Sequence, residues 1–315
     1  MTTKRIVLAG GSGFLGQGLA GTFRQRGYEV VVLTRLPSKR DTRVNELYWD
    51  GKTLGDWATH IESAQAVVNL AGRTVNCRYH ARNRREILDS RLDSTKVLGE
   101  AIAKCGHPPR VWLNSSTATI YRHSFDRPMD EATGEIGATP EAKDAFSVEV
   151  ARAWEKALDD ACAPATRKIA LRTAMVLGSA RNSVLPVLRR LVRLGLGGNM
   201  ASGRQYVSWI HEEDFCTAVH WLIERDDISG RVNLAAPNPV TNRELMETVR
   251  RVCGIPFGLP ASRWMLEIGA FLLRTETELI VKSRRVVPGR LIASGFQFRF
   301  PKLEDALRDL ECRSS

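Results

Sequence analysis

The sequence lacks long apolar runs and paired cysteines, and each absence removes a class of protein. The best candidate for a membrane span, the ten residues from Trp264, contains Glu267 and is short of the roughly 20 residues that a span requires. The 6 cysteines form no C-x-x-C pair, so neither a zinc site nor a disulfide framework is indicated. We therefore predict a cytoplasmic protein with free thiols, no bound metal and no membrane span.

Acidic residues are too few to balance the basic ones: 35 Asp and Glu stand against 46 Lys and Arg, a net charge of +11. This excess favours an anionic partner such as a phosphorylated cofactor or an acidic small molecule. The densest basic stretch, residues 77–85, has a single aromatic residue, whereas nucleic-acid surfaces interleave several. Nucleic acid is thus an unfavoured partner, and its binding would have to collapse as salt rises. A homo-oligomer stays open.

Strand and helix patterns alternate along the first part of the chain. Apolar, β-branched runs predict strands at residues 5–10, 28–35, 64–72, 110–121 and 168–178, and helical spacing predicts helices at 16–27, 83–104, 144–162 and 212–225. Such alternation predicts an α/β fold with a doubly wound parallel sheet of the Rossmann type. We assign residues 1–178 and 207–229 to this domain, and residues 179–206 and 230–315 to a second, smaller α+β C-terminal domain.

The segment "GGSGFLG", residues 10–16, lies between the first predicted strand and the first predicted helix. Its glycines permit a tight turn and let backbone N–H groups approach a pyrophosphate. A merely flexible turn is the alternative, but the β-α-β context disfavours it. The predicted contacts are Gly10, Gly11, Ser12, Gly13, Phe14, Leu15 and Gly16.

The end of the second strand predicts which dinucleotide binds. It reads "LTR", with Lys39 and Arg40 close behind and no acidic residue before Asp41. An acidic residue here would hold the ribose hydroxyls of NAD, whereas an arginine suits the 2′-phosphate of NADP. We predict NADP(H), held by Arg35 with help from Ser12 and Thr34. The alternative is a solvated arginine.

Together, "GGSGFLG", "NLAG" (69–72) and "NSSTATIY" (114–121) resemble the extended short-chain dehydrogenase/reductases. That resemblance implies that Thr117, four residues before Tyr121, polarises a substrate oxygen with Ser115 or Ser116 nearby. It also implies a tyrosine and a lysine four residues apart further along, where this chain has Phe146 and Val150. The one literal Y-x-x-x-K, Tyr48 to Lys52, precedes both later motifs and cannot lie on the helix beside the active site.

A closer resemblance covers nearly the whole chain. "NLAG", "ILDSRLDST" (87–95), "WEKA" (154–157) and the segments 193–215 and 284–310 resemble the atypical short-chain dehydrogenases called epimerase-like, which have their own C-terminal domain. The resemblance implies NADP(H) binding, usually without the tyrosine–lysine pair. It implies cofactor contacts at Thr34, Arg35, Leu70, Ala71, Gly72, Glu86, Arg91 and Val176.

Two features of this resemblance leave room for other interpretations. Arg91 could instead form a surface salt bridge with Glu86 or Asp89. The basic segment 76–85 departs from the family, whose members usually have a tryptophan-containing stretch here. That departure puts the substrate-facing wall in doubt.

Other residues were candidates for the missing proton donor or for substrate contact. Tyr121 and His123 follow the serine-rich strand at its carboxyl edge, where ligands bind in such sheets, although a loop histidine is more often solvated. We expect His211 and Asp214 to begin a helix, Arg204 and Arg284 to face an anionic substrate, and Trp154 and Trp209 to pack in the core.

Two hypotheses follow. The first is an NADP(H)-dependent oxidoreductase or epimerase-like enzyme acting on an unknown small molecule, in which Thr117 polarises a carbonyl. The second is a non-catalytic NADP(H)-binding module that senses redox state or binds a partner. Phe146 and Val150 favour the second hypothesis.

Overall fold

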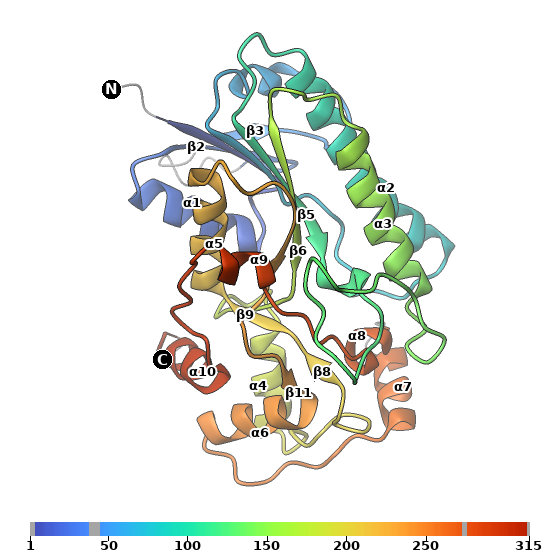
Figure 1. The fold of residues 1–315 in the computed structure, drawn as a ribbon. Helices are drawn as coiled ribbons and strands as arrows, with labels where there is room; N and C mark the ends of the chain where they lie inside the picture. Colours follow the sequence, from blue (N-terminus) through green and yellow to red (C-terminus); the bar gives the residue numbers. More distant parts are fainter. Residues whose placement is uncertain (1–3, 38–44, 273–275, 314–315) are drawn as a thin grey trace.

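A computed structural model describes residues 4–37, 45–272 and 276–313, and its central element is a seven-stranded parallel sheet (Figure 1). The strand order is β10-β6-β5-β4-β1-β2-β3. The order changes direction between β1 and β4, so a crevice opens there at the carboxyl edge. The strands are β1 (Arg5–Ala9), β2 (Glu29–Thr34), β3 (Asn45–Tyr48), β4 (Ala66–Asn69), β5 (Val111–Thr117), β6 (Arg167–Thr173) and β10 (Gly230–Leu234).

Helices cover both faces of this sheet, which confirms the predicted doubly wound fold. The helices α1 (Phe14–Gln25) and α5 (Glu212–Glu224) pack on one face, and α2 (Ala81–Ala103) and α3 (Ala145–Asp160) on the other (Figure 1). Side chains of a strand alternate between faces. In β1, Ile6 and Leu8 therefore join the core under α1 and α5, and Val7 and Ala9 the core under α2.

A smaller region packs around a third core that contains the fully buried Trp209, as predicted for that residue. Strand β7 pairs with β9, β8 pairs with β11, and α6 packs against α4 and α10. Its elements are β7 (Met175–Leu177), α4 (Leu185–Arg193), β8 (Tyr206–Val207), β9 (Trp209–His211), β11 (Val240–Thr241), α6 (Asn242–Val252), α7 (Arg263–Leu272), α8 (Glu278–Val281) and α10 (Leu303–Cys312).

The predicted start of the smaller domain at residue 230 is wrong, because β10 is an edge strand of the main sheet and pairs with β6. The helix α9 (Gly289–Ala293) packs against β10 and buries Leu291 in the main core. The pattern failed here because β10 is short and lies between a Gly-containing turn and a Pro-rich loop.

Smaller elements also differ from the prediction. The edge strand β3 was missed, and the strand predicted at 168–178 is divided into β6 and β7, which pair with different partners. Two 3₁₀ helices, η1 (Asp56–His60) and η2 (Ala118–Ile120), complete the fold.

Within the described part of the chain, no helix has both the length and the apolar character needed to cross a membrane. The same residues contain no group of three His, Cys, Asp or Glu side chains arranged to hold a metal ion.

Candidate functional site

The glycine turn between β1 and α1 leaves no room for a side chain at Gly10 or Gly16. Gly10 has φ +74°, and a Cβ there would lie 2.8 Å from Ala71 Cα. A Cβ on Gly16 would lie 2.3 Å from the carbonyl oxygen of Gly11. The helix α1 begins after Gly13 without a side-chain cap, so its first N–H groups are available to an anion.

The end of β2 faces this turn. Thr34 is buried and its hydroxyl donates to Ser12 Oγ at 3.0 Å, which fixes both side chains at the carboxyl edge. Arg35 is exposed and lines the same cavity, so its guanidinium is available to a phosphate. Lys39, Arg40 and Asp41, also considered from the sequence, lie outside the described residues.

A cavity of about 660 Å³, here called the glycine-loop cavity, brings most of the predicted cofactor contacts together. Gly11 and Gly16 form the turn behind it, Phe14 packs toward Gly178, and Val176 packs against the core without lining the cavity. The predicted residues in its wall are Gly10, Ser12, Gly13, Thr34, Arg35, Leu70, Ala71, Gly72 and Glu86.

Two cations in this wall were not predicted. Lys52 forms a salt bridge with Asp93 at 3.3 Å, and Arg73 forms one with Glu86. Glu86 also accepts from Arg82 Nε at 2.8 Å. The predicted cofactor contact at Glu86 is thus a carboxylate already paired with two arginines. Sequence spacing does not reveal these cations, because each enters from a loop whose path is set by tertiary contacts.

Arg91 does not form the surface salt bridge considered for it, and its predicted contact with the cofactor stays a prediction. Its Nη1 donates to the carbonyl oxygens of Ile87 (2.9 Å) and Arg73 (3.2 Å), and its guanidinium lies 5.0 Å from the ring of Trp154. Among the described residues no carboxylate pairs with it, so the salt bridge with Glu86 or Asp89 is absent. Burial lowers the pKa of Arg91 to about 10, which still leaves it charged at neutral pH.

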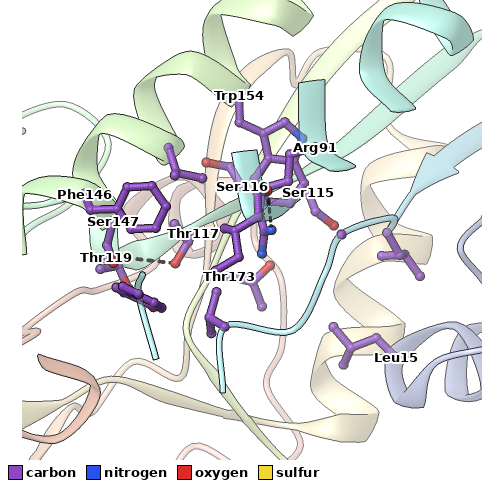
Figure 2. A pocket seen from close by; sticks show the side chains of 16 residues that line it. Leu15, Arg91, Ser115, Ser116, Thr117, Thr119, Phe146, Ser147, Trp154 and Thr173 are labelled. Carbon is purple, nitrogen blue, oxygen red and sulfur yellow. Dashed lines mark hydrogen bonds between the residues drawn. The ribbon is translucent and has the colours of Figure 1, made fainter. Parts of the chain in front are cut away.

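A second cavity of about 270 Å³, here called the adjoining cavity, shares Leu70 and Gly72 with the first. Figure 2 shows Phe146 at one end, Leu15 at the other, and Arg91 and Trp154 above the serine-rich strand. Its wall consists of Leu15, Leu70, Gly72, Val75, Tyr79, Ile87, Arg91, Ser115, Ser116, Thr117, Thr119, Phe146, Ser147, Val150, Trp154 and Thr173.

The three hydroxyl residues of β5 have different environments. Thr117 Oγ1 accepts the N–H of Thr119 at 3.1 Å, so its own proton is free to point into the cavity. The Ser115 hydroxyl makes no hydrogen bond within the described residues. Ser116 instead donates to the buried carboxylate of Glu155 at 2.7 Å, so its hydroxyl proton is engaged, which favours a structural role over the predicted catalytic one.

Tyr121 and His123 line neither cavity, which does not favour their prediction as substitute proton donors. The hydroxyl of Tyr121 is buried, donates to Asn233 Oδ1 at 3.0 Å and accepts from Arg172 Nη1 at 2.9 Å. His123 Nδ1 accepts the N–H of Ser283 at 2.8 Å. Tyr121 thus joins the segment after β5 to β6 and β10, and His123 joins that segment to the C-terminal region.

The helix α3 places Phe146 and Val150 in the wall of the adjoining cavity, where they cluster with Ile87. Trp154, one turn further, combines the predicted packing role with a place in this wall, and its Nε1 donates to Thr95 Oγ1 at 3.1 Å. The tyrosine that reaches the cavity is Tyr79, from the loop before α2, and it was not among the predicted site residues. It is the single aromatic residue of the basic stretch 77–85.

The remaining predicted residues fall into two groups. His211 caps α5 by accepting the N–H of Glu213 at 3.1 Å, and Asp214 accepts the N–H groups of Arg299 and Phe300, so both are structural as predicted. Arg204 is exposed and lines neither cavity. Arg284 lies close enough to Glu278 and Tyr79 for their charges to interact.

The parallel sheet, the glycine turn and the cavity at the topological switch point define an NAD(P)-binding Rossmann protein of the short-chain dehydrogenase type. The chain belongs to the NAD dependent epimerase/dehydratase family, whose model matches residues 6–235. A domain of unknown function, DUF1731, matches residues 261–310.

Relatives match along nearly the whole chain. Epimerase family protein YfhF of Bacillus subtilis is 31% identical over 310 residues, covering 97% of each chain. Epimerase family protein SDR39U1 of Mus musculus is 30% identical over 312 residues, covering 97% of this chain and 99% of the relative. The crystal structure of human SDR39U1 with NADPH superposes with a TM-score of 0.83 at 28% identity, covering 97% of this chain and 98% of that one.

Proposed function

We propose that this protein is an NADP(H)-dependent oxidoreductase or epimerase-like enzyme that acts on a small anionic molecule at a carbonyl or hydroxyl carbon. The observation that carries the proposal is the adjoining cavity, which shares Leu70 and Gly72 with the glycine-loop cavity and has in its wall the hydroxyls of Ser115 and Thr117, whose protons are not engaged by other described residues. A molecule held there lies next to whatever dinucleotide the first cavity holds.

The residues of the glycine-loop cavity fit NADP(H). Arg35 suits the 2′-phosphate, and the turn at Gly10 and Gly13 suits the pyrophosphate, since a side chain at Gly10 would collide with Ala71. The NADPH bound in the human SDR39U1 structure supports this choice. When bound, NADP(H) would supply or accept a hydride.

The adjoining cavity suggests how the chain would treat its substrate. Thr117 donates its free hydroxyl proton to the substrate oxygen, and Ser115 offers a second hydroxyl. Arg91 gives the wall a positive charge, which supports an anionic substrate. Phe146 and Val150 occupy the places of the tyrosine–lysine pair, so the enzyme works without that pair.

The test follows deuterium from NADPH labelled at the transferable C4 position into a metabolite extract, with mass spectrometry as the readout. We expect label in a metabolite, and a rate that falls about 10²–10³-fold in Thr117→Val because one donor to the developing oxyanion is lost. Thr59→Val, at an exposed threonine of η1, is the matched control.

The second candidate is a non-catalytic NADP(H)-binding module, and Phe146 and Val150 are the observation that favours it. It predicts tight NADPH binding with no movement of deuterium into any metabolite. That result would overturn the first proposal.

A further inference from the structure

We propose that Tyr79 exchanges the substrate proton in the adjoining cavity, and that Ser147 and Glu278 position it and connect it to a proton store. The inference rests on the proposed function, and it assigns a proton donor to a site whose usual one is replaced by Phe146. This proposed proton donor differs from that of the extended short-chain dehydrogenases because Tyr79 comes from the loop before α2 and not from the helix that contains Phe146.

Contacts from two directions hold Tyr79 at the cavity wall. Its backbone N–H donates to Glu276 Oε1 at 2.7 Å, which ties the loop before α2 to the C-terminal region. Its ring packs edge-on against Phe146, with centroids 5.1 Å apart and an interplanar angle of 70°. The ring of Phe146 therefore orients the ring of Tyr79, although Phe146 itself has no group that could exchange a proton.

A path of polar side chains leads away from the tyrosine. Ser147 lines the same cavity as Tyr79 and lies close enough to it to lower the pKa of the phenol, and Ser147 Oγ donates to Glu278 Oε2 at 3.0 Å. Glu278 is only 5% exposed, and its Oε1 has no hydrogen-bond partner among the described residues. A buried carboxyl with an unused oxygen is costly as an anion, so the site favours its protonated form.

The pKa values of Tyr79 and Glu278, at the two ends of this path, suit proton exchange with the substrate. Burial raises the pKa of Tyr79 to about 12, and burial also raises the pKa of Glu278. Tyr79 is thus protonated at neutral pH and remains a stronger acid than the alcohol that forms when the substrate alkoxide takes up its proton. The charged and titratable groups that act on it are Glu276, Glu278, Cys77, Arg91 and Arg284.

The other hydroxyls near the cavity are less suited to proton exchange. Thr117 and Ser115 have aliphatic hydroxyls, which are much weaker acids than a phenol. Ser116 donates to Glu155, and the hydroxyl of Tyr121 is buried with Arg172. Tyr79 is the one phenol in the wall of the adjoining cavity as the described residues define it.

The proton transfer balances in both directions. In reduction, a C–H bond forms as the hydride reaches the carbonyl carbon, the C=O π bond breaks, and the oxygen takes the phenolic proton of Tyr79. Ser147 then gives its proton to Tyr79 and receives one from the carboxyl of Glu278, which regains a proton from water. In oxidation each proton moves the opposite way, and hydroxyl rotation permits either direction.

The first test measures deuterium transfer from C4-labelled NADPH into the metabolite extract by wild type, Tyr79→Phe and Tyr48→Phe. We expect Tyr79→Phe to lower the rate about 10²–10⁴-fold with unchanged NADPH affinity, since phenylalanine keeps the ring packing but loses the acid. Tyr48 is 66% exposed on β3 and begins the literal Y-x-x-x-K, so Tyr48→Phe should retain the wild-type rate.

The second test concerns the two positioning residues. Ser147→Ala should lower the rate, and Ser147→Thr should restore most of it because the hydroxyl returns. With ¹³Cζ-tyrosine labelling, the NMR titration of Tyr79 should shift in Ser147→Ala and in Glu278→Gln, which is a readout independent of turnover. Unchanged Tyr79 titration in both variants would remove the relay and overturn the role of Ser147 and Glu278.

The outcomes separate the two proposals. If wild type transfers deuterium and Tyr79→Phe does so equally fast, Tyr79 is not the proton donor and only this inference fails. If wild type transfers no deuterium, the proposed function fails and this inference fails with it.

Discussion

The glycine-loop cavity and the adjoining cavity differ in how the chain builds them. The first is lined entirely by residues between 10 and 90, which belong to consecutive β-α-β units. The second takes residues from α1, β5, β6, α3 and the loop before α2, with support from α8. A cavity made by one continuous supersecondary unit has a local sequence signature, whereas one assembled from distant segments has none.

The two cavities also differ in chemistry. The first offers backbone N–H groups, Arg35 and paired charges, which suit phosphates. The second offers aromatic and aliphatic walls with a few hydroxyls and one half-buried arginine, which suit a small molecule with a polar reacting group.

The substitution with the largest expected effect is Gly16→Ala, which disrupts the glycine-loop cavity. Gly16→Ala places a methyl group where the carbonyl of Gly11 lies, so the turn must open, and loss of two or more charge-assisted hydrogen bonds should weaken NADPH binding about 100-fold or more. Gly21→Ala, also in α1 but with open space at its Cβ, should bind normally and gain about 0.5–1 kcal/mol of stability. NADPH fluorescence titration of both variants checks this, and normal binding by Gly16→Ala would contradict it.

The second-largest expected effect concerns the buried pair of Glu155 and Arg172, which supports the wall of the adjoining cavity through Ser116. Glu155 accepts from Arg172 Nε and Nη2 at 2.8 Å each, both side chains are buried, and Arg172 holds the pKa of Glu155 below its usual range despite burial. Glu155→Ala leaves Arg172 buried without its partner and should cost about 3–5 kcal/mol in the free energy of unfolding. Urea unfolding measures this.

The neighbouring Lys156→Ala is the matched control for that experiment. It removes only an exposed pair with Asp160, so the change should stay near 0.3–0.5 kcal/mol. Equal losses in the two variants would show that Ser116 and Glu155 do not form a structural support for β5.

A smaller expected effect tests whether Arg35 in the glycine-loop cavity binds the 2′-phosphate of NADPH. Arg35→Ala should weaken NADPH binding about 10–100-fold, the equivalent of a charge-assisted hydrogen bond of about 1.5–3 kcal/mol. NADH binding should not change, because NADH has no 2′-phosphate. Arg26→Ala, at the far end of α1, is the control, and an equal loss for both nucleotides would contradict the assignment.

The smallest expected effect is a pH dependence of the protein's stability, which comes from the buried carboxyl group of Glu278 beside the adjoining cavity. Burial raises the pKa of Glu278 in the folded protein, so the folded state holds this proton more tightly than the unfolded state. Its contribution to stability is therefore complete below the unfolded pKa and is lost as pH rises through the folded pKa. Glu278→Gln should remove this loss, so the Tm of the variant minus that of wild type should increase from pH 4 toward pH 8.

Glu247→Gln, at an exposed glutamate of α6, is the matched control for the change of charge. A Tm difference for Glu278→Gln that stays constant over the same pH range would show that Glu278 does not hold its proton more tightly when folded.

The residues that were predictable from sequence lie at strand ends close to the glycine turn. Thr34 and Arg35 follow from their distance to that turn, and Thr117 from its place on the serine-rich strand. The environments of Ser116 and Tyr121 were not predictable, because hydrogen bonds with Glu155, Arg172 and Asn233, up to 112 residues away, occupy their hydroxyls.

The sequence by itself determined the Rossmann fold and the phosphate-binding end of the site, because short-range steric and hydrogen-bonding rules act within one β-α-β unit. Only the tertiary structure decided that β10 joins the main sheet and that Tyr79, Ser147 and Glu278 meet beside Phe146. Those contacts join segments up to 197 residues apart, as between Tyr79 and Glu276, and no local pattern records which distant segments pack together.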